Sequence, residues 1–166
     1  MSGGPPGATL SPSAAKVQAA LDAAGVPTRI VEHAVAARTS AQAAEVLGCT
    51  VAQIAKSLVF RAASGRPVLV IASGSQRVDE SKVAALVGEP IGKADPAFVR
   101  AATGYAIGGI PPLGHPAPLS PLIDRNLLDY DVVYAAGGTP NAMFPVAPGE
   151  LVRASGGTPA DVAVSP

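Results

Sequence analysis

The sequence predicts a single α/β domain with a mixed β-sheet. The chain has 166 residues, of which 48% are hydrophobic and 14% charged, and this composition supports one domain with a substantial core. Helical and strand patterns alternate along it, and several expected strand pairs are joined by turns too short for a helical crossover. No internal repeat or linker divides the chain. We expect a flexible N-terminal tail over residues 1–12 and one domain over residues 13–166.

Helix starts are marked by residues that cap a helix N-terminus. Thr39 begins a capping-box pattern, and Asp79 precedes a helical run. The pair Asp95-Pro96 suits a helix start because proline is favoured at the first helical position. The expected helices run from a cap at Ser11 or Ser13 to about residue 24, over residues 41–47, 80–87 and 96–102, and from residue 148 to Gly156.

Strands are indicated by alternation or by short apolar runs. Residues 68–72, VLVIA, are typical of a buried strand, and a Ser-Gly-Arg-Pro turn joins them to a strand over residues 57–62. Residues 110–121 contain five prolines and are expected to be irregular. Further strands are expected over residues 28–33, 105–107, 122–124, 132–135 and 142–146, and residues 161–166 receive no assignment.

Charge and cysteine content limit the partners. The chain has 12 Lys and Arg against 12 Asp and Glu, so it lacks the basic excess typical of proteins that bind duplex DNA. The single Cys49 excludes an internal disulfide framework and fits a reducing cytosol, so we expect a cytoplasmic protein. No apolar run approaches the roughly 18 residues of a membrane span, and the N-terminus lacks the features of a signal peptide.

Lys56 stands at the start of an apolar run, in the segment AKSLVF. One interpretation is that its stem lies along the core while its ammonium reaches water. The other is a partly buried ammonium in a cleft, where it could hold a phosphate or carbonyl oxygen or act as a base or amine nucleophile. The residues alone leave both interpretations open.

Two glycine pairs, Gly108-Gly109 and Gly137-Gly138, lie in the segments GYAIGGIPPLGH and VVYAAGGTPNAMF. Glycine serves tight turns because it reaches positive φ. It also lets a ligand approach backbone N–H groups that stabilise a developing negative charge. Neither pair fits a dinucleotide-binding or P-loop motif.

Other catalytic patterns are weak. His33 and His115 are the only histidines, and with one cysteine they provide no metal-ligand spacing, so neither a metal nor a cofactor is predicted. The nucleophile elbow GxSxG does not occur, and a packed or idle thiol is the expected state of Cys49. His115 either lines the rim of a cleft or caps its own loop.

Six motifs follow one another in a specific order: KSLVF, VLVIASG, DESKV, ADP, TGYAIGGIPPLGH and YAAGGTPNAMF. In this order they resemble the YbaK/EbsC/ProX family of aminoacyl-tRNA deacylases, which is related to the editing domain of bacterial prolyl-tRNA synthetases. The resemblance covers about residues 17–152. It implies a curved, barrel-like mixed sheet surrounded by helices. It also implies hydrolysis, in trans, of the ester that joins a wrong amino acid to the 3′ end of a tRNA.

The resemblance implies site residues as well. Lys56 matches the family's essential lysine, and Gly108 and Gly109 match the glycine loop beside the reacting carbonyl, so these three are the expected catalytic residues. Ala136 begins a second loop that reads Ser-Gly-Gly in many relatives. The residues expected to bind substrate are Ser57, Thr39, Ile110, His115, Ala136, Gly137, Gly138 and Asn141.

Two departures from the family pattern bear on the substrate. Relatives that act on cysteinyl-tRNA(Pro) carry an aspartate shortly after the second glycine pair, where this chain has Asn141. Thr39 stands in the region where an aromatic residue is expected. The preference for cysteine is therefore not carried over. We expect a small amino acid on a tRNA(Pro)-type substrate, with prolyl-tRNA synthetase as a candidate partner.

A non-catalytic module is the alternative function. It would bind aminoacyl-tRNA ends or a synthetase in the same cleft without turnover, and the departures at Ala136 and Asn141 keep it open. The presence of Lys56 favours catalysis, because a degenerate homologue has less reason to keep this lysine. Sequence-specific DNA binding is disfavoured by the missing basic patch.

Overall fold

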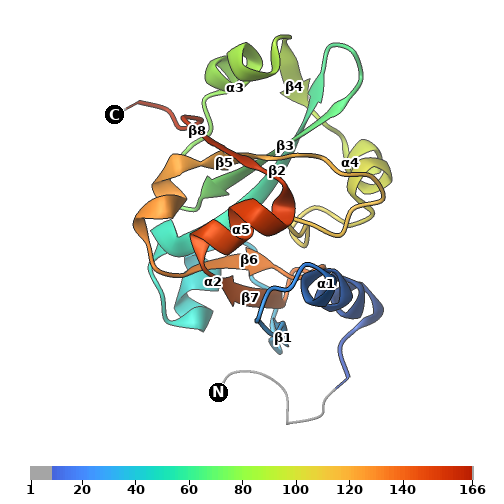
Figure 1. Cartoon of the computed structure of the whole chain (residues 1–166), viewed down its shortest axis with the longest axis vertical. Coiled ribbons are helices and arrows are strands. Elements are labelled where there is room, and N and C mark those ends of the chain that lie inside the picture. The colour runs from blue at the N-terminus through green and yellow to red at the C-terminus, as the bar shows by residue number, and fades with distance from the viewer. Residues whose placement is uncertain (1–8, 166) are drawn as a thin grey trace.

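The computed structural model describes residues 9–165. Most of the expected N-terminal tail, residues 1–12, lies outside this range, and Ser11 and Pro12 belong to the first turn of a helix. Figure 1 shows a curved sheet with helices packed around it. The helices are α1 (Pro12–Ala23), α2 (Ser40–Leu47), α3 (Glu80–Val87), α4 (Pro96–Thr103) and α5 (Pro148–Ser155), with short 3-10 helices at Val51–Gln53 and Arg125–Asp129.

Eight strands in the described residues form one sheet in the order β1-β7-β6-β2-β3-β5-β8, with β4 added to β2. The pairs β1·β7, β6·β7, β2·β3 and β2·β4 are antiparallel, whereas β2·β6, β3·β5 and β5·β8 are parallel. The predicted mixed, curved sheet is therefore confirmed. The strands are β1 (Val31–Glu32), β2 (Ile54–Ala62), β3 (Pro67–Ser73), β4 (Ile91–Lys93), β5 (Leu122–Asp124), β6 (Val133–Ala136), β7 (Ala142–Val146) and β8 (Thr158–Ala160).

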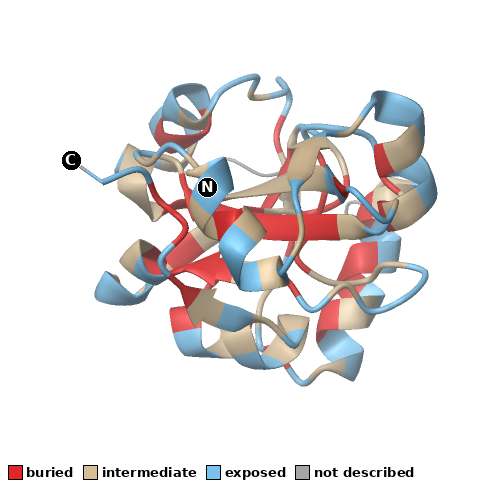
Figure 2. Cartoon of the chain, turned by 90° about the horizontal axis from the view of Figure 1, so that it is seen from above, coloured by how far each residue is buried: buried red, intermediate tan, exposed pale blue. Residues whose placement is uncertain are grey.

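The core lies between the curved sheet and the helices, and Figure 2 shows buried residues concentrated on the central strands. In β3 every residue after Pro67 is buried, which confirms the prediction for the apolar run VLVIA. The largest buried cluster joins this strand to α1, to β6 and β7, and to Tyr105 and Ile110. The two distant glycine-containing segments are thus brought to the same side of the core.

The predicted caps explain where the helices begin. The hydroxyl of Thr39 accepts a hydrogen bond from the Gln42 amide at 3.1 Å, and Asp95 accepts one from the Phe98 amide at 2.8 Å. The side chain of Gln42 turns back to the amide of Arg38 at 2.8 Å, one residue before the cap. This contact fixes the backbone of Arg38 at the start of α2. No described helix is long and apolar enough to cross a membrane.

Two strand predictions need correction. Residues 105–107 form no strand, because they find no partner and instead enter a turn in which the Gly109 amide donates to the Ala106 carbonyl at 3.1 Å. Of residues 28–33 only β1 pairs with another strand. The preceding backbone is bonded instead by the buried Gln18 side chain, which contacts the Thr28 carbonyl and the Ile30 amide.

The sequence patterns missed the short strands β4 and β8. They also left the C-terminal segment without an assignment, although Val162 and Ala163 are buried. The ammonium of Lys82 holds this segment, since it donates to the Ala163 carbonyl at 2.7 Å and pairs with Asp161 at 3.0 Å. Beyond β8 this segment also forms an isolated antiparallel bridge, between Ala163 and Val78.

Candidate functional site

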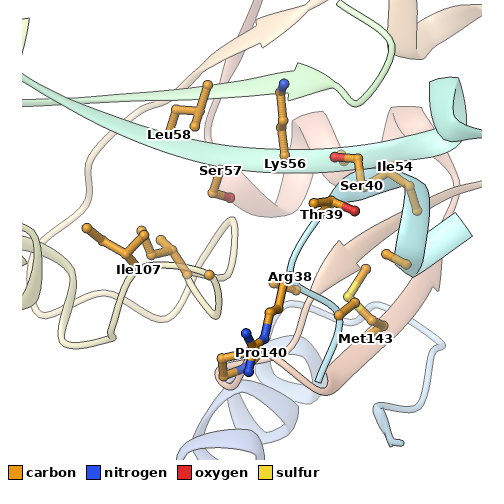
Figure 3. A pocket seen from close by; sticks show the side chains of 16 residues that line it. Arg38, Thr39, Ser40, Ile54, Lys56, Ser57, Leu58, Ile107, Pro140 and Met143 are labelled. Carbon is orange, nitrogen blue, oxygen red and sulfur yellow. The ribbon is translucent and has the colours of Figure 1, made fainter. Parts of the chain in front are cut away.

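A cavity of about 340 Å³ opens between β2, the start of α2 and the loop that precedes the proline-rich segment. Its size lies within the usual range of small-molecule sites. Figure 3 shows side chains of these three elements around it. The lining residues are Ala37, Arg38, Thr39, Ser40, Ala43, Ile54, Ala55, Lys56, Ser57, Leu58, Ile107, Gly108, Ile110, Ala136, Pro140 and Met143.

The cavity lies beside an interruption in the sheet. Strand β6 pairs with β2 only at Ile54 and Ala55, and β4 joins the same edge of β2 from Phe60 onward. Lys56, Ser57 and Leu58, which line the cavity, fall between these two pairings. The site is therefore built on a stretch of β2 that has a neighbouring strand on one edge only.

Lys56 lies within β2 opposite Ala72 of β3 and is half-buried. Within residues 9–165 its ammonium has no hydrogen bond and no ion pair. The lining residues include no Asp or Glu, so no carboxylate in the cavity neutralises this charge. Lys56 thus lines the cavity, and its charge stays available to a ligand.

Arg38 adds a second positive charge that the sequence reasoning missed. Its side chain is exposed and lines the cavity. In Figure 3 the Lys56 side chain projects from one face of β2, and Arg38 lies beyond the other face. The available signal was the position of Arg38 directly before the cap of α2, since residues around a helix N-terminus often contact anions.

The two glycine pairs pack against each other. The Gly138 amide donates to the Gly109 carbonyl at 3.0 Å. A Cβ added to Gly109 would lie 2.7 Å from the Thr139 Cα, and one added to Gly138 would lie 2.8 Å from the Ser13 carbonyl oxygen. Gly137 is equally confined, because its Cβ would lie 2.9 Å from Ile30. These three glycines permit close backbone packing.

Gly108 differs from the other three glycines. It lines the cavity, it is exposed, and its φ of +95° is a conformation that glycine adopts readily. The amides of Gly109, Gly137 and Gly138 donate to carbonyl groups of the chain, whereas the Gly108 amide has no acceptor within the described residues. Of the two glycine pairs, only Gly108 offers an unpaired N–H at the cavity.

The predicted residues therefore fall into two groups. Lys56, Gly108, Ser57, Thr39, Ile110 and Ala136 line the cavity, whereas Gly109, Gly137, Gly138, His115 and Asn141 do not. Asn141 is used within its loop, where its amide group donates to the His33 carbonyl at 2.8 Å and its oxygen accepts from the Thr139 hydroxyl at 3.0 Å. These bonds hold the second loop in place.

His115 does not line the cavity and instead contacts Tyr105 and its own loop. Its ring meets Tyr105 edge-on, with 6.5 Å between ring centroids, and its Nε2 lies 2.8 Å from the Pro111 carbonyl oxygen. Burial lowers the pKa of His115 from its ordinary value, and the hydrogen bond to Pro111 opposes this shift. The contacts support the interpretation that His115 stabilises its own loop.

Besides Arg38, the sequence reasoning missed the apolar lining. Met143 and Ile54 belong to a small buried cluster with α2, and Ile107 stands exposed at the cavity. Ile107 and Met143 stand in the two glycine-containing motifs, but no local pattern marks their apolar side chains as part of a cavity. Within residues 9–165 no group of three or more His, Cys, Asp or Glu residues is placed to hold a metal ion.

The fold and the cavity define a class of protein. The sequence model of the aminoacyl-tRNA editing domain matches residues 34–154, which include Lys56 and both glycine pairs. The chain belongs to this family, and its fold is that of the YbaK-like editing domains.

Three individual proteins are similar to this chain. A crystal structure described as "a putative trans-editing enzyme for prolyl tRNA synthetase" has 45% identity and a TM-score of 0.90, and the match covers 95% of this chain and 100% of that one. The structure of "hypothetical protein APE2540" has 34% identity and a TM-score of 0.83 over 90% and 99% of the two chains. "Uncharacterized protein YwhH" of Bacillus subtilis (strain 168) is 31% identical over 122 residues, which are 74% of this chain and 78% of that protein.

Proposed function

We propose that this chain is an aminoacyl-tRNA deacylase that hydrolyses, in trans, the ester linking a small amino acid to the 3′ end of a mischarged tRNA. One observation carries the proposal. Lys56, whose ammonium has no partner within residues 9–165, lines a cavity without carboxylates, and Gly108 presents an unpaired amide at the same cavity. This combination suits a substrate that carries phosphate and develops negative charge on a carbonyl oxygen.

The reaction needs an attacking water and stabilisation of the tetrahedral oxyanion. Water adds to the ester carbonyl, the bond to the ribose oxygen breaks, and this oxygen leaves as a hydroxyl with one proton from the water. The Gly108 N–H is the donor that we assign to the oxyanion, a contribution of about 3 kcal/mol per donor in comparable sites. Lys56 positions the terminal adenosine, through its phosphate, and the scissile ester.

A covalent acyl-enzyme is not part of this mechanism. Neither histidine lines the cavity, so Ser57 and Thr39 have no histidine base beside them. The attacking water is activated by a substrate hydroxyl or by the substrate side chain.

The amino acid is expected to be small and of low polarity. Ala43, Ala136 and Met143 contribute apolar surface to the cavity, and Ala136 supplies a methyl group where many relatives have a hydroxyl. A pocket of this kind separates neighbouring aliphatic side chains by only about 1–3 kcal/mol per methylene. The cavity is therefore expected to discriminate only gradually between amino acids whose side chains differ in size.

The tRNA(Pro) preference and the partnership with prolyl-tRNA synthetase also belong to the proposal. They are supported by the description of the structural relative with 45% identity. The formal net charge of zero fits a protein that contacts one acceptor end through a few phosphates. The cytoplasm is the compartment in which such a substrate is expected.

The test is a deacylation panel. Wild-type protein is incubated with tRNA(Pro) charged with alanine, serine, cysteine or proline, and with other mischarged tRNAs as controls, and the remaining ester is measured over time. We expect hydrolysis of small mischarged residues and sparing of prolyl-tRNA(Pro). Binding of these tRNAs without hydrolysis of any would replace the deacylase with the non-catalytic module.

A further inference from the structure

The interruption in the sheet leaves main-chain groups of β2 without partners. On one edge β2 pairs with β3 along almost its whole length, from Ala55 to Arg61. On the other edge β6 ends its pairing at Ala55 and β4 begins at Phe60. Residues between these points have no neighbouring strand on that edge, and the cavity lies there.

Hydrogen bonds at the two ends of β2 show which residues face this open edge. The Ile54 carbonyl accepts from Gly74 and the Ala62 amide donates to Arg66, both on the β3 side. The Ala63 amide donates to Pro90 on the β4 side. Because N–H and C=O groups of successive strand residues alternate between the two edges, even-numbered residues face β3 and odd-numbered residues face the open edge.

Ser57 is therefore the cavity residue whose amide and carbonyl both point to the open edge. Its hydroxyl is a second, independent observation. The Ser57 Oγ is buried and has no hydrogen-bond partner among the described residues. In Figure 3 this side chain points away from Lys56 and Leu58, toward the side of the loop that carries Ile107. Buried polar groups are usually paired, so an unpaired donor beside an unpaired strand edge points to a polar ligand.

The ligand that fits Ser57 has the hydrogen-bonding pattern of one amino acid residue. In an antiparallel hydrogen-bonded pair, the N–H and C=O of one residue bond the C=O and N–H of the residue opposite. An aminoacyl ester offers the same two groups, an α-amino N–H and an ester C=O. Since no Asp or Glu lines the cavity, the α-amino group has no carboxylate to bind and needs a carbonyl acceptor.

We propose that Ser57 anchors the aminoacyl group through its main chain, as if the amino acid were one residue of an added antiparallel strand. The Ser57 carbonyl accepts from the α-amino group and the Ser57 amide donates to the acyl carbonyl. This inference rests on the proposed function for the identity of the ligand. It defines the substrate class as α-aminoacyl groups, because an acyl group without the amino donor makes only one of the two bonds.

The test uses two analogues that cannot be hydrolysed. In 3′-alanylamido-3′-deoxyadenosine an amide replaces the ester, and 3′-propionylamido-3′-deoxyadenosine lacks only the α-amino group. Binding is measured by titration, and amide exchange is followed by NMR with ¹⁵N-labelled protein. We expect the alanyl analogue to slow exchange of the Ser57 amide at least about tenfold and to bind about tenfold more tightly than the propionyl analogue.

Controls separate this anchor from a structural role. The amides of Lys56 and Leu58 face β3, so their slow exchange is expected to stay unchanged on binding. Ser57→Ala keeps both main-chain groups and removes a hydroxyl that has no partner in the free protein. It is therefore expected to leave the melting temperature and the roughly tenfold preference for the alanyl analogue unchanged.

Equal affinity for the two analogues, unchanged exchange of the Ser57 amide at saturation, or no binding of the alanyl analogue would overturn the anchor. The measurement does not depend on turnover. A protein that binds the analogues through Ser57 but hydrolyses no aminoacyl-tRNA would disprove the deacylase and keep the anchor.

Discussion

The amide of Gly138 donates a hydrogen bond to the carbonyl of Gly109 at 3.0 Å, and this bond joins the two glycine loops. Gly109 and Gly138 are 29 positions apart in the sequence, so the contact closes a long segment. It fixes the turn that presents the Gly108 amide to the cavity. The close packing of Gly109, Gly137 and Gly138 thus holds the backbone turn at Gly108 in place.

Gly109→Ala is predicted to destabilise the fold by about 2–3 kcal/mol, because its methyl group would overlap the Thr139 backbone at 2.7 Å. Urea denaturation measures this change. Gly149→Ala is the matched control, since a Cβ at Gly149 meets nothing within 4 Å. If both substitutions changed the free energy of unfolding equally little, the two glycine loops would not need to pack closely for the fold to be stable.

Arg38→Gln is predicted to raise the KM for a mischarged aminoacyl-tRNA about threefold to tenfold. It should also make KM less dependent on salt, by about the amount expected for the loss of one phosphate contact. The guanidinium lines the cavity and has no ion pair within residues 9–165, so folding stability should stay unchanged. Steady-state kinetics at several salt concentrations provide the measurement. Arg77→Gln, an exposed arginine that does not line the cavity, is the control. If the two variants had the same KM and the same salt dependence, Arg38 would not contact the substrate.

The stability of the protein is predicted to fall as the pH drops below the ordinary histidine value of 6.5, partly through His115. Burial lowers the pKa of His115 in the folded state, so in this range the unfolded chain binds more protons than the folded chain. The contribution is present above pH 6.5 and is lost on acidification. Denaturation of wild type and His115→Gln between about pH 5 and 8 tests this, and the variant should show the flatter profile. Parallel profiles would assign the pH dependence to other groups.

Local signals were sufficient to predict most helices. Thr39, Asp79 and Asp95 cap α2, α3 and α4 as expected, and glycines in the left-handed region end these helices. Each signal acts within a few residues and needs no tertiary partner. The strands β4 and β8 have three residues each and no alternation, so only their pairing with β2 and β5 defines them. Sequence patterns could not supply that pairing.

Part of the candidate site could also be predicted from the sequence. Lys56 and Gly108 stand in distinctive motifs, and both line the cavity. The open edge at Ser57 depends on where β6 and β4 end along β2, which no local pattern specifies. The resemblance placed Asn141 among the residues that bind substrate, whereas its side chain is engaged by His33 and Thr139.

The most direct test of the account is the rate of deacylation by Lys56→Met, measured in a single turnover on the best substrate of the panel. Methionine keeps an apolar stem and removes the ammonium, which makes no bond within the described residues, so the free energy of unfolding should change by no more than about 0.5 kcal/mol. We predict a rate lower by a factor on the order of 100 or more in a folded protein. A folded Lys56→Met variant with the wild-type rate would contradict it.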